Sequence, residues 1–229
     1  MKSVAILQSN YIPWRGYFDM IASVDEFILY DDMQFTKNDW RNRNRIKTPS
    51  GPAWISVPVG AAIHRRIKDV ELTDHSWQAR HWKTLRANYS RAPAFDAVAV
   101  WLEPLYLAET HVSLSALNLC FIEAICGFLG IKTRISNSWD YNLGEGKTER
   151  LVDLCKQAGA TTYVSGPAAR DYLDESLFAG ENIGVHWFDY AGYPEYRQLW
   201  GPFEPQVSIL DLLFNCGTQS ARFMKKVRS

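Results

Sequence analysis

The second half of the chain repeats one pattern three times: a helical run of apolar residues is followed by a short apolar run that suits a strand. Ser113 precedes the first helical run and is a candidate N-cap for it. Gly130 and Gly159 come directly after the first two helical runs and favour their ends. Such helix–strand units are typical of parallel α/β architecture, in which each helix returns the chain to the same edge of a sheet. The three units span 114–129 with 131–136, 148–158 with 161–164, and 170–178 with 184–188.

The first thirty residues extend this pattern. Apolar residues predict a buried strand at 3–8, a helix at 16–23 and a second strand at 27–30. We therefore expect a single α/β domain over 1–229, Rossmann-like, with a mostly parallel sheet, flanking helices and a helical insertion at about 60–112. The remaining predicted elements are a strand at 53–59, which Pro58 places at a sheet edge, and helices at 76–90 and 208–214.

Polar residues follow each predicted strand of the sheet. Because ligands of open α/β sheets bind at the carboxyl ends of the strands, these residues are candidates for a binding site. Trp14 and Tyr17 come just after the first strand, where their rings either contact a ligand or fill the core. Ser165 either binds a phosphate or hydroxyl group or belongs to a Ser-Gly-Pro turn. The candidates along this edge are Gln8, Asn10, Tyr11, Trp14, Gln34, Ser165 and Gly166.

A basic stretch at 37–47 contains three alternating arginines, Arg41, Arg43 and Arg45. Alternate residues of an extended chain project to one side, so the three guanidinium groups are placed to bind a diphosphate. The alternative is a solvated edge strand that its charges keep from aggregating. The interleaved residues, which suit stacking on a base or sugar and hydrogen bonding to its hydroxyls, are Trp40, Asn42 and Asn44.

Three charged residues are candidates for catalysis. Asp31 and Asp32, at the end of the second predicted strand, suit a general base, a Mg²⁺ ligand or a partner for a ribose hydroxyl, and the alternative is a solvated turn. Lys147 precedes a predicted helix and is placed to stabilise negative charge, while Thr148 beside it either contacts an anion or caps that helix. A P-loop is excluded because Tyr141 stands where that motif requires glycine.

Motifs spread along the chain resemble those of the WbqC-like family. The resemblance covers nearly the whole sequence and is weakest between residues 92 and 111. The matching motifs are Gln-x-Asn-Tyr-Ile-Pro-Trp-x-Gly-Tyr-Phe from Gln8, Asp-Asp-x-Gln from Asp31, Trp-Arg-Asn-Arg-Asn-Arg-Ile from Trp40, Gly-Lys-Thr-Glu from Gly146, Thr-Tyr-Val-Ser-Gly from Thr162, and Ser-Ile-Leu-Asp-Leu-Leu-Phe-Asn-x-Gly from Ser208.

The resemblance implies a function in bacterial surface-polysaccharide (O-antigen) biosynthesis, and some relatives are described as glycine transferases acting on amino sugars. We expect a cytoplasmic transferase that acylates, with glycine in one version, the amino group of a nucleotide-activated amino sugar. Tyr11 and Trp14 would stack on the base or the sugar. Amide formation needs an activated carboxyl group, so ATP with Mg²⁺ or an acyl thioester is the expected co-reactant, and the sequence leaves this choice open.

Two other functions remain open. The first is a non-catalytic protein that binds nucleotide sugars or glycans. The second is an ATP-dependent ligase or nucleotidyltransferase, because the opening strand, loop and helix also resemble nucleotidyltransferase-type folds. Those enzymes hold ATP with a His-x-Gly-His element, whereas the corresponding loop here contains Trp14 and Arg15 and no histidine.

The composition of the chain limits the classes of partner that we expect for it. The formal net charge is zero, which favours neither nucleic acid nor a membrane surface as a partner. No stretch approaches the ~20 apolar residues of a membrane helix, and no export signal is evident. Four cysteines without a Cys-x-x-Cys pair fit reduced thiols in the cytoplasm. Five scattered histidines lack metal-ligand spacing, so we expect no structural metal.

Overall fold

The computed structural model describes residues 1–62 and 64–227. Its centre is a five-stranded sheet in the order β5-β2-β1-β6-β7, and every neighbouring pair is parallel. This is the predicted Rossmann-like class, with β1 in the middle and the chain building outward to each side in turn. The strands are β1 (Ser3–Leu7), β2 (Glu26–Leu29), β5 (Arg134–Asn137), β6 (Thr162–Ser165) and β7 (Gly184–Trp187).

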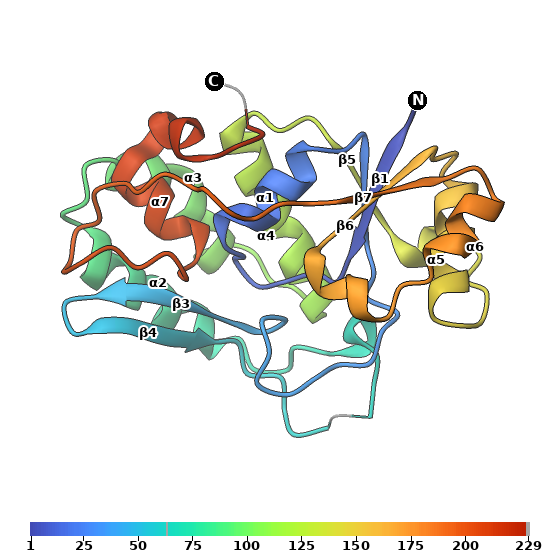
Figure 1. Ribbon diagram of the computed structural model, residues 1–229. Helices are drawn as coiled ribbons and strands as arrows, with labels where there is room; N and C mark the ends of the chain where they lie inside the picture. Colours follow the sequence, from blue (N-terminus) through green and yellow to red (C-terminus); the bar gives the residue numbers. More distant parts are fainter. Residues whose placement is uncertain (63, 228–229) are drawn as a thin grey trace.

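Helices cover both faces of the sheet (Figure 1). Helices α1 (Arg15–Ala22) and α4 (Leu114–Leu129) lie on one face, and α5 (Thr148–Gln157) and α6 (Glu175–Gly180) on the other. The alternation of β1 explains this, because Ala5 packs with the α1 and α4 side while Val4 and Ile6 pack with α5.

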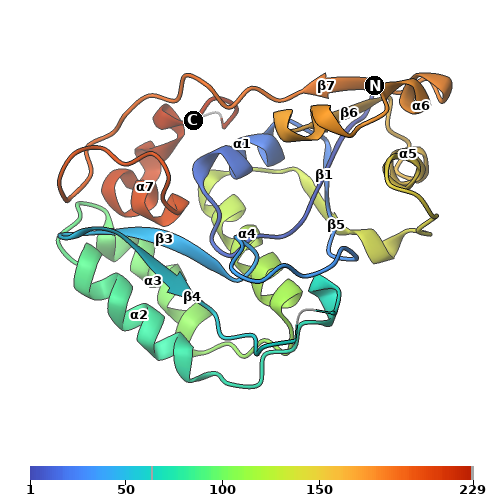
Figure 2. The same cartoon turned by 60° about the horizontal axis from the view of Figure 1, so that its bottom comes forward.

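A second group of elements lies beside the sheet, on the side of α1 and α4 (Figure 2). An antiparallel hairpin packs there against two helices, a third helix packs against both of these, and the core of this group is continuous with that of the α1 and α4 layer. The elements are β3 (Arg43–Thr48), β4 (Gly51–Ser56), α2 (Ser76–Tyr89), α3 (Phe95–Leu107) and α7 (Ile209–Cys216). The 3₁₀ turns are η1 (Ile67–Asp69), η2 (Ser138–Asp140), η3 (Pro167–Asp171) and η4 (Gly217–Phe223).

The ends of α4 are those the sequence predicts. The hydroxyl of Ser113 accepts a hydrogen bond from the amide of Ala116 at 3.2 Å, as an N-cap should. Gly130 closes the helix with φ of 72°, a left-handed conformation that glycine adopts without strain.

Three expectations need correction. The strand at 53–59 is β4, which pairs with β3 outside the parallel sheet and ends before Pro58. The helix at 170–178 is divided into η3 and α6, because Asp174 caps α6 by accepting a hydrogen bond from Ser176. The expected helical insertion at about 60–112 contains α3 but did not delimit it, because Pro104 interrupts the pattern within the helix.

Candidate functional site

The centre of the sheet contains a pocket where the strand order reverses. Strands β1 and β6 are neighbours, yet the chain leaves them toward opposite edges, and this crevice is where open α/β sheets bind ligands. The pocket encloses about 430 Å³. We call it the switch-point pocket; its polar and aromatic lining residues are Gln8, Tyr30, Lys147, Arg150, Tyr163, Ser165 and Tyr172.

The switch-point pocket is positively charged. Lys147 is the N-cap of α5, and Arg150 lies one turn further along that helix. Neither forms an ion pair with any residue that the structure describes, and none of the pocket's described lining residues is acidic. The Arg150 Nε donates to the carbonyl of Gly144 at 2.7 Å, which orients the guanidinium group. Burial raises the pKa of Tyr30, and nearby Arg150 opposes that rise.

Arg41 connects this pocket to a second one. Its two terminal nitrogens donate separately to the side-chain oxygens of Gln8 and Asn10. Gln8 lines the switch-point pocket, whereas Asn10 lines a separate pocket on the other side of the loop. The Arg41 side chain is mostly buried, and the nearest carboxylate, that of Asp39, lies 3.7 Å away. One guanidinium group therefore lies between the two pockets.

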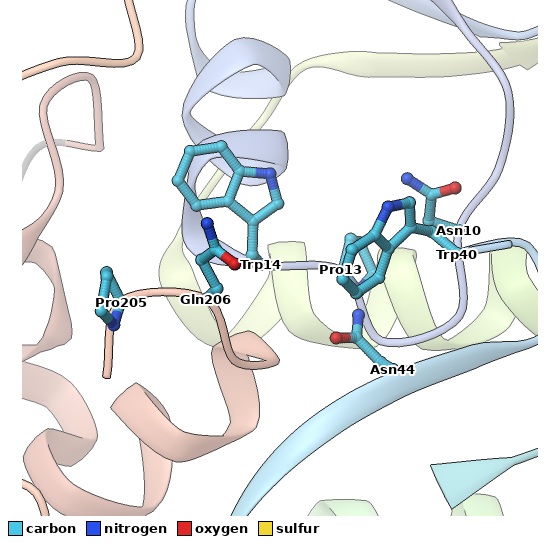
Figure 3. A pocket seen from close by; sticks show the side chains of 7 residues that line it. All are labelled: Asn10, Pro13, Trp14, Trp40, Asn44, Pro205 and Gln206. Carbon is cyan, nitrogen blue, oxygen red and sulfur yellow. The ribbon is translucent and has the colours of Figure 1, made fainter. Parts of the chain in front are cut away.

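The second pocket encloses about 450 Å³ and is bounded by two indole rings (Figure 3). Trp14 comes from the loop before α1 and Trp40 from the loop before β3, and in Figure 3 the Trp14 ring lies to the left of Pro13 and of the Trp40 ring. We call this the Trp pocket; its lining residues are Asn10, Pro13, Trp14, Trp40, Asn44, Pro205 and Gln206.

The floor of the Trp pocket is held by Asn44. Its amide nitrogen donates to the carbonyls of Tyr11 and Ile12 at 3.0 and 2.9 Å, and its oxygen accepts from the amide of Arg45 at 2.8 Å. The carbonyl of Ile12 also accepts a hydrogen bond from the Ser208 hydroxyl at 2.7 Å. Ile12 has φ of 39°, an uncommon conformation for a β-branched residue, and these bonds hold it there.

The sequence pattern of the WbqC-like protein family matches residues 8–223. The chain belongs to the WbqC-like family. An uncharacterized protein of Mycobacterium tuberculosis (strain ATCC 25618 / H37Rv), Rv1507c, is 58% identical over 230 residues, which is 100% of both chains. No solved structure matches the chain.

In this WbqC-like protein the three arginines of the basic stretch do not meet at one pocket. Arg43 and Arg45 lie over the indole of Trp54 on β4, with guanidinium-to-ring distances of 4.2 and 5.9 Å. Neither lines the switch-point pocket or the Trp pocket. Arg41 does not line either pocket itself and reaches them only through Gln8 and Asn10, so the three arginines do not form the predicted diphosphate clamp. Asn42 is buried in the hairpin and donates to the carbonyl of Val57 at 2.8 Å.

Asp31 is not accessible as a general base. It is fully buried, and its oxygens accept hydrogen bonds from the amide and hydroxyl of Ser9 at 2.8 and 2.7 Å and from the hydroxyl of Ser115 at 2.6 Å. Burial raises the pKa of Asp31, and these bonds oppose the rise. Its role is to position Ser9, which stands between Gln8 and Asn10.

Asp32 points elsewhere. One of its oxygens pairs with Lys68 at 2.5 Å, and the other accepts from the Ser138 hydroxyl at 2.8 Å. Asp32 and Gln34 line a shallow hollow with Arg66, apart from both pockets. The two acids therefore do not act as a pair: Asp31 belongs to a buried hydrogen-bond network, and Asp32 forms an ion pair with Lys68.

Tyr11 and Thr148 also differ from their predicted binding roles. Tyr11 is fully buried, and its hydroxyl contacts His81 Nδ1 at 2.9 Å and the Tyr106 hydroxyl at 2.7 Å, so its ring fills the core. Thr148 is buried behind the pocket and accepts from the amide of Asp174 at 3.3 Å. Ser165 and Gly166 lie at the end of β6 and do line the switch-point pocket, as predicted.

Several residues that line the two pockets were not predicted from the sequence. Arg150 was detectable, because it lies three residues after Lys147 on the same helix and shares its face. Pro205 and Gln206 were not, because they reach the Trp pocket from almost two hundred residues away and carry no motif of their own.

One group of residues has the donor set for a metal. Among the described residues, side-chain atoms of Glu109, His111 and Cys120 all lie within 4.8 Å of one another. None of them lines either pocket, so the group is separate from the site described above.

Proposed function

We propose that this protein is a cytoplasmic transferase of bacterial surface-polysaccharide biosynthesis that binds a nucleotide-activated amino sugar and acylates its amino group. The observation that carries the proposal is the switch-point pocket, which combines unpaired cations with a position where α/β sheets bind nucleotides. Its volume of about 430 Å³ suits a ligand of this size.

Phosphate recognition follows from the start of α5. The exposed ammonium group of Lys147 supplies a point charge, and the planar guanidinium group of Arg150 supplies a fork of donors. The first turn of the helix adds free backbone N–H groups and the positive end of the helix dipole. Together these groups favour a diphosphate over a neutral ligand.

The reaction would be an acyl transfer from a thioester. The amine nitrogen of the sugar attacks the acyl carbonyl carbon, a C–N bond forms, and the acyl–sulfur bond breaks with the electron pair leaving on sulfur. No described carboxylate lines either pocket, so the proton lost by the amine would pass to water. The protein's contribution in this scheme is binding and orientation, which account for a large share of many enzymatic rate enhancements.

The binding half of the proposal is tested by calorimetric titration with UDP and dTDP. We expect both to bind, and we expect replacing Lys147 and Arg150 together with alanine to weaken binding at least a hundredfold, because each charge-assisted bond contributes roughly 1.5–3 kcal/mol. Lys156→Ala is the matched control, since Lys156 lies at the far end of α5 and pairs with Glu181. No binding of either nucleotide would overturn the proposal.

The catalytic half is tested by mass spectrometry of UDP-amino sugars incubated with acyl-CoA and the protein. We expect the mass of an amide product, and its absence with the Lys147 and Arg150 double variant. Binding without turnover under any acyl donor would instead indicate a non-catalytic nucleotide-sugar-binding protein. The lack of a carboxylate among the described lining residues is the observation that favours this second function.

A further inference from the structure

The Trp pocket holds its two indole rings in fixed positions. Trp14 packs against Tyr190 and Tyr193, with ring centroids 5.3 and 5.7 Å apart. A Cβ at position 16 would lie 2.3 Å from the Trp14 ring, so Gly16 allows the indole to rest on the start of α1. Trp40 is 40% exposed and leans on Trp54 at 5.1 Å. A ligand that stacks here meets rings whose positions are already set.

The pocket's amide groups are oriented by two arginines outside it. Arg41 donates to the oxygen of Asn10, and Arg45 Nη2 donates to the oxygen of Gln206 at 2.8 Å. A guanidinium group has no acceptor, so each amide must turn its oxygen toward the arginine. The nitrogens of Asn10 and Gln206 bond to no residue that the structure describes, and Figure 3 shows the nitrogen of Asn10 nearer the pocket than its oxygen.

This arrangement makes the free polar groups of the Trp pocket hydrogen-bond donors. Asn44 contributes no free hydrogen-bonding group to the pocket, because its side-chain oxygen and nitrogen are both bonded to the backbone. None of the described lining residues is charged. The matching ligand therefore carries no positive charge, has an apolar face for the indoles and presents acceptor oxygens. A pyranose ring with hydroxyl or acylamino oxygens has these properties, whereas an ammonium group, which can only donate, does not.

We propose that the Trp pocket binds the sugar ring of the nucleotide sugar in its uncharged form. The nucleotide would occupy the switch-point pocket, and Arg41, which contacts both Gln8 and Asn10, would lie beside the diphosphate between them. This inference rests on the proposed function, because it places a second part of the same ligand. It also specifies the form of the sugar: an amine enters as the neutral, nucleophilic species.

The test compares the affinities of UDP and UDP-N-acetylglucosamine by calorimetry. We expect the sugar to strengthen binding at least tenfold over UDP. In Trp40→Ala this gain disappears while the affinity for UDP stays unchanged. Trp139→Ala is the matched control, because Trp139 is also 40% exposed, lies on η2 and lines neither pocket. Melting curves of each variant show whether it is folded.

A second variant tests the donor pattern without changing the packing. Gln206→Glu keeps the oxygen that Arg45 binds and replaces the free donor with an acceptor. We expect it to lose the gain from N-acetylglucosamine and to bind UDP-glucosamine, which carries an amine, more tightly than the natural protein does.

The outcomes separate the two proposals. If UDP binds but the sugar adds nothing, or if Trp40→Ala keeps the gain, the inference is overturned and the proposed function stands. If UDP does not bind, the proposed function fails, and titration with a methyl glycoside of N-acetylglucosamine decides on the Trp pocket by itself. Binding of the glycoside that Gln206→Glu abolishes supports the pocket, and no binding overturns it.

Discussion

The two pockets differ in where their polarity comes from. The switch-point pocket draws its charge from Lys147 and Arg150, whose cations face the space directly. In the Trp pocket the cations stand outside, and Arg41 and Arg45 act through the amides that they orient. A cationic side chain near a pocket therefore makes that pocket cationic when it faces the space, and neutral and rich in donors when an amide lies between the two.

Arg41→Ala should have the largest effect, because it removes what the two pockets share. Loss of two charge-assisted hydrogen bonds at roughly 1.5–3 kcal/mol each would free both Gln8 and Asn10. We expect affinity for a nucleotide sugar to fall about a thousandfold in calorimetry, and UDP affinity to fall as well. A loss confined to one ligand would show that Arg41 serves one pocket only. Arg43→Ala, on the same stretch but over Trp54, is the control.

Acid should destabilise the fold that carries both pockets through His81, which lines neither of them. Burial lowers the pKa of His81 to about 4, so between pH 6.5 and 4 the unfolded chain takes up a proton that the folded chain does not. The contribution of neutral His81 to the free energy of unfolding is therefore fully present above pH 6.5. It is lost as the pH falls, and the loss reaches about 3 kcal/mol at pH 4. Denaturant unfolding at several pH values measures this. His81→Gln should flatten the curve, since Tyr11, which follows Asn10, then has a neutral partner at every pH.

Gly16→Ala should affect the Trp pocket alone. The new methyl group would overlap the Trp14 ring and push it from the start of α1. We expect the gain from the sugar ring to fall about tenfold, the scale of one lost stacking contact. The affinity for UDP should stay as it was. An equal loss for both ligands would mean that α1 itself had shifted, and Gly127→Ala, where a Cβ meets no atom, controls for added bulk on a helix.

Salt should give the smallest effect and the simplest contrast. Salt screens cations that face solvent, and the Debye length shortens as the ionic strength rises. We therefore expect UDP binding to weaken several-fold between about 0.05 and about 0.5 M salt. The additional affinity from the sugar should not change, because no charged residue lines the Trp pocket among those described. If the affinity for UDP and the additional affinity from the sugar depended equally on salt, the difference in charge between the two pockets would be contradicted.

The sheet was readable from the sequence because its signals are local. The apolar runs, the cap at Ser113 and the stop at Gly130 each act within a few residues, and the parallel order follows from the repeated helix–strand unit. The edge of the sheet that carries the switch-point pocket could be predicted for the same reason, and Ser165 and Lys147 do line it.

The roles of single residues were harder to predict because they depend on distant partners. Asp31 and Asp32 are neighbours in sequence, yet one is enclosed by Ser9 and Ser115 and the other pairs with Lys68. Tyr11 is directed into the core by His81. No spacing rule encodes these contacts, since each joins segments that only the folded chain brings together.

The bond between Ser208 and Ile12 also sets an order of events during synthesis. It joins residues 196 positions apart, and the amide of Ile209 donates to the carbonyl of Pro13 beside it. The parallel sheet is complete once residue 187 has left the ribosome, but the Trp pocket lacks Pro205 and Gln206 until about twenty residues later. A growing chain would thus form the switch-point pocket first, and the Trp pocket could close only after residue 206 had been added.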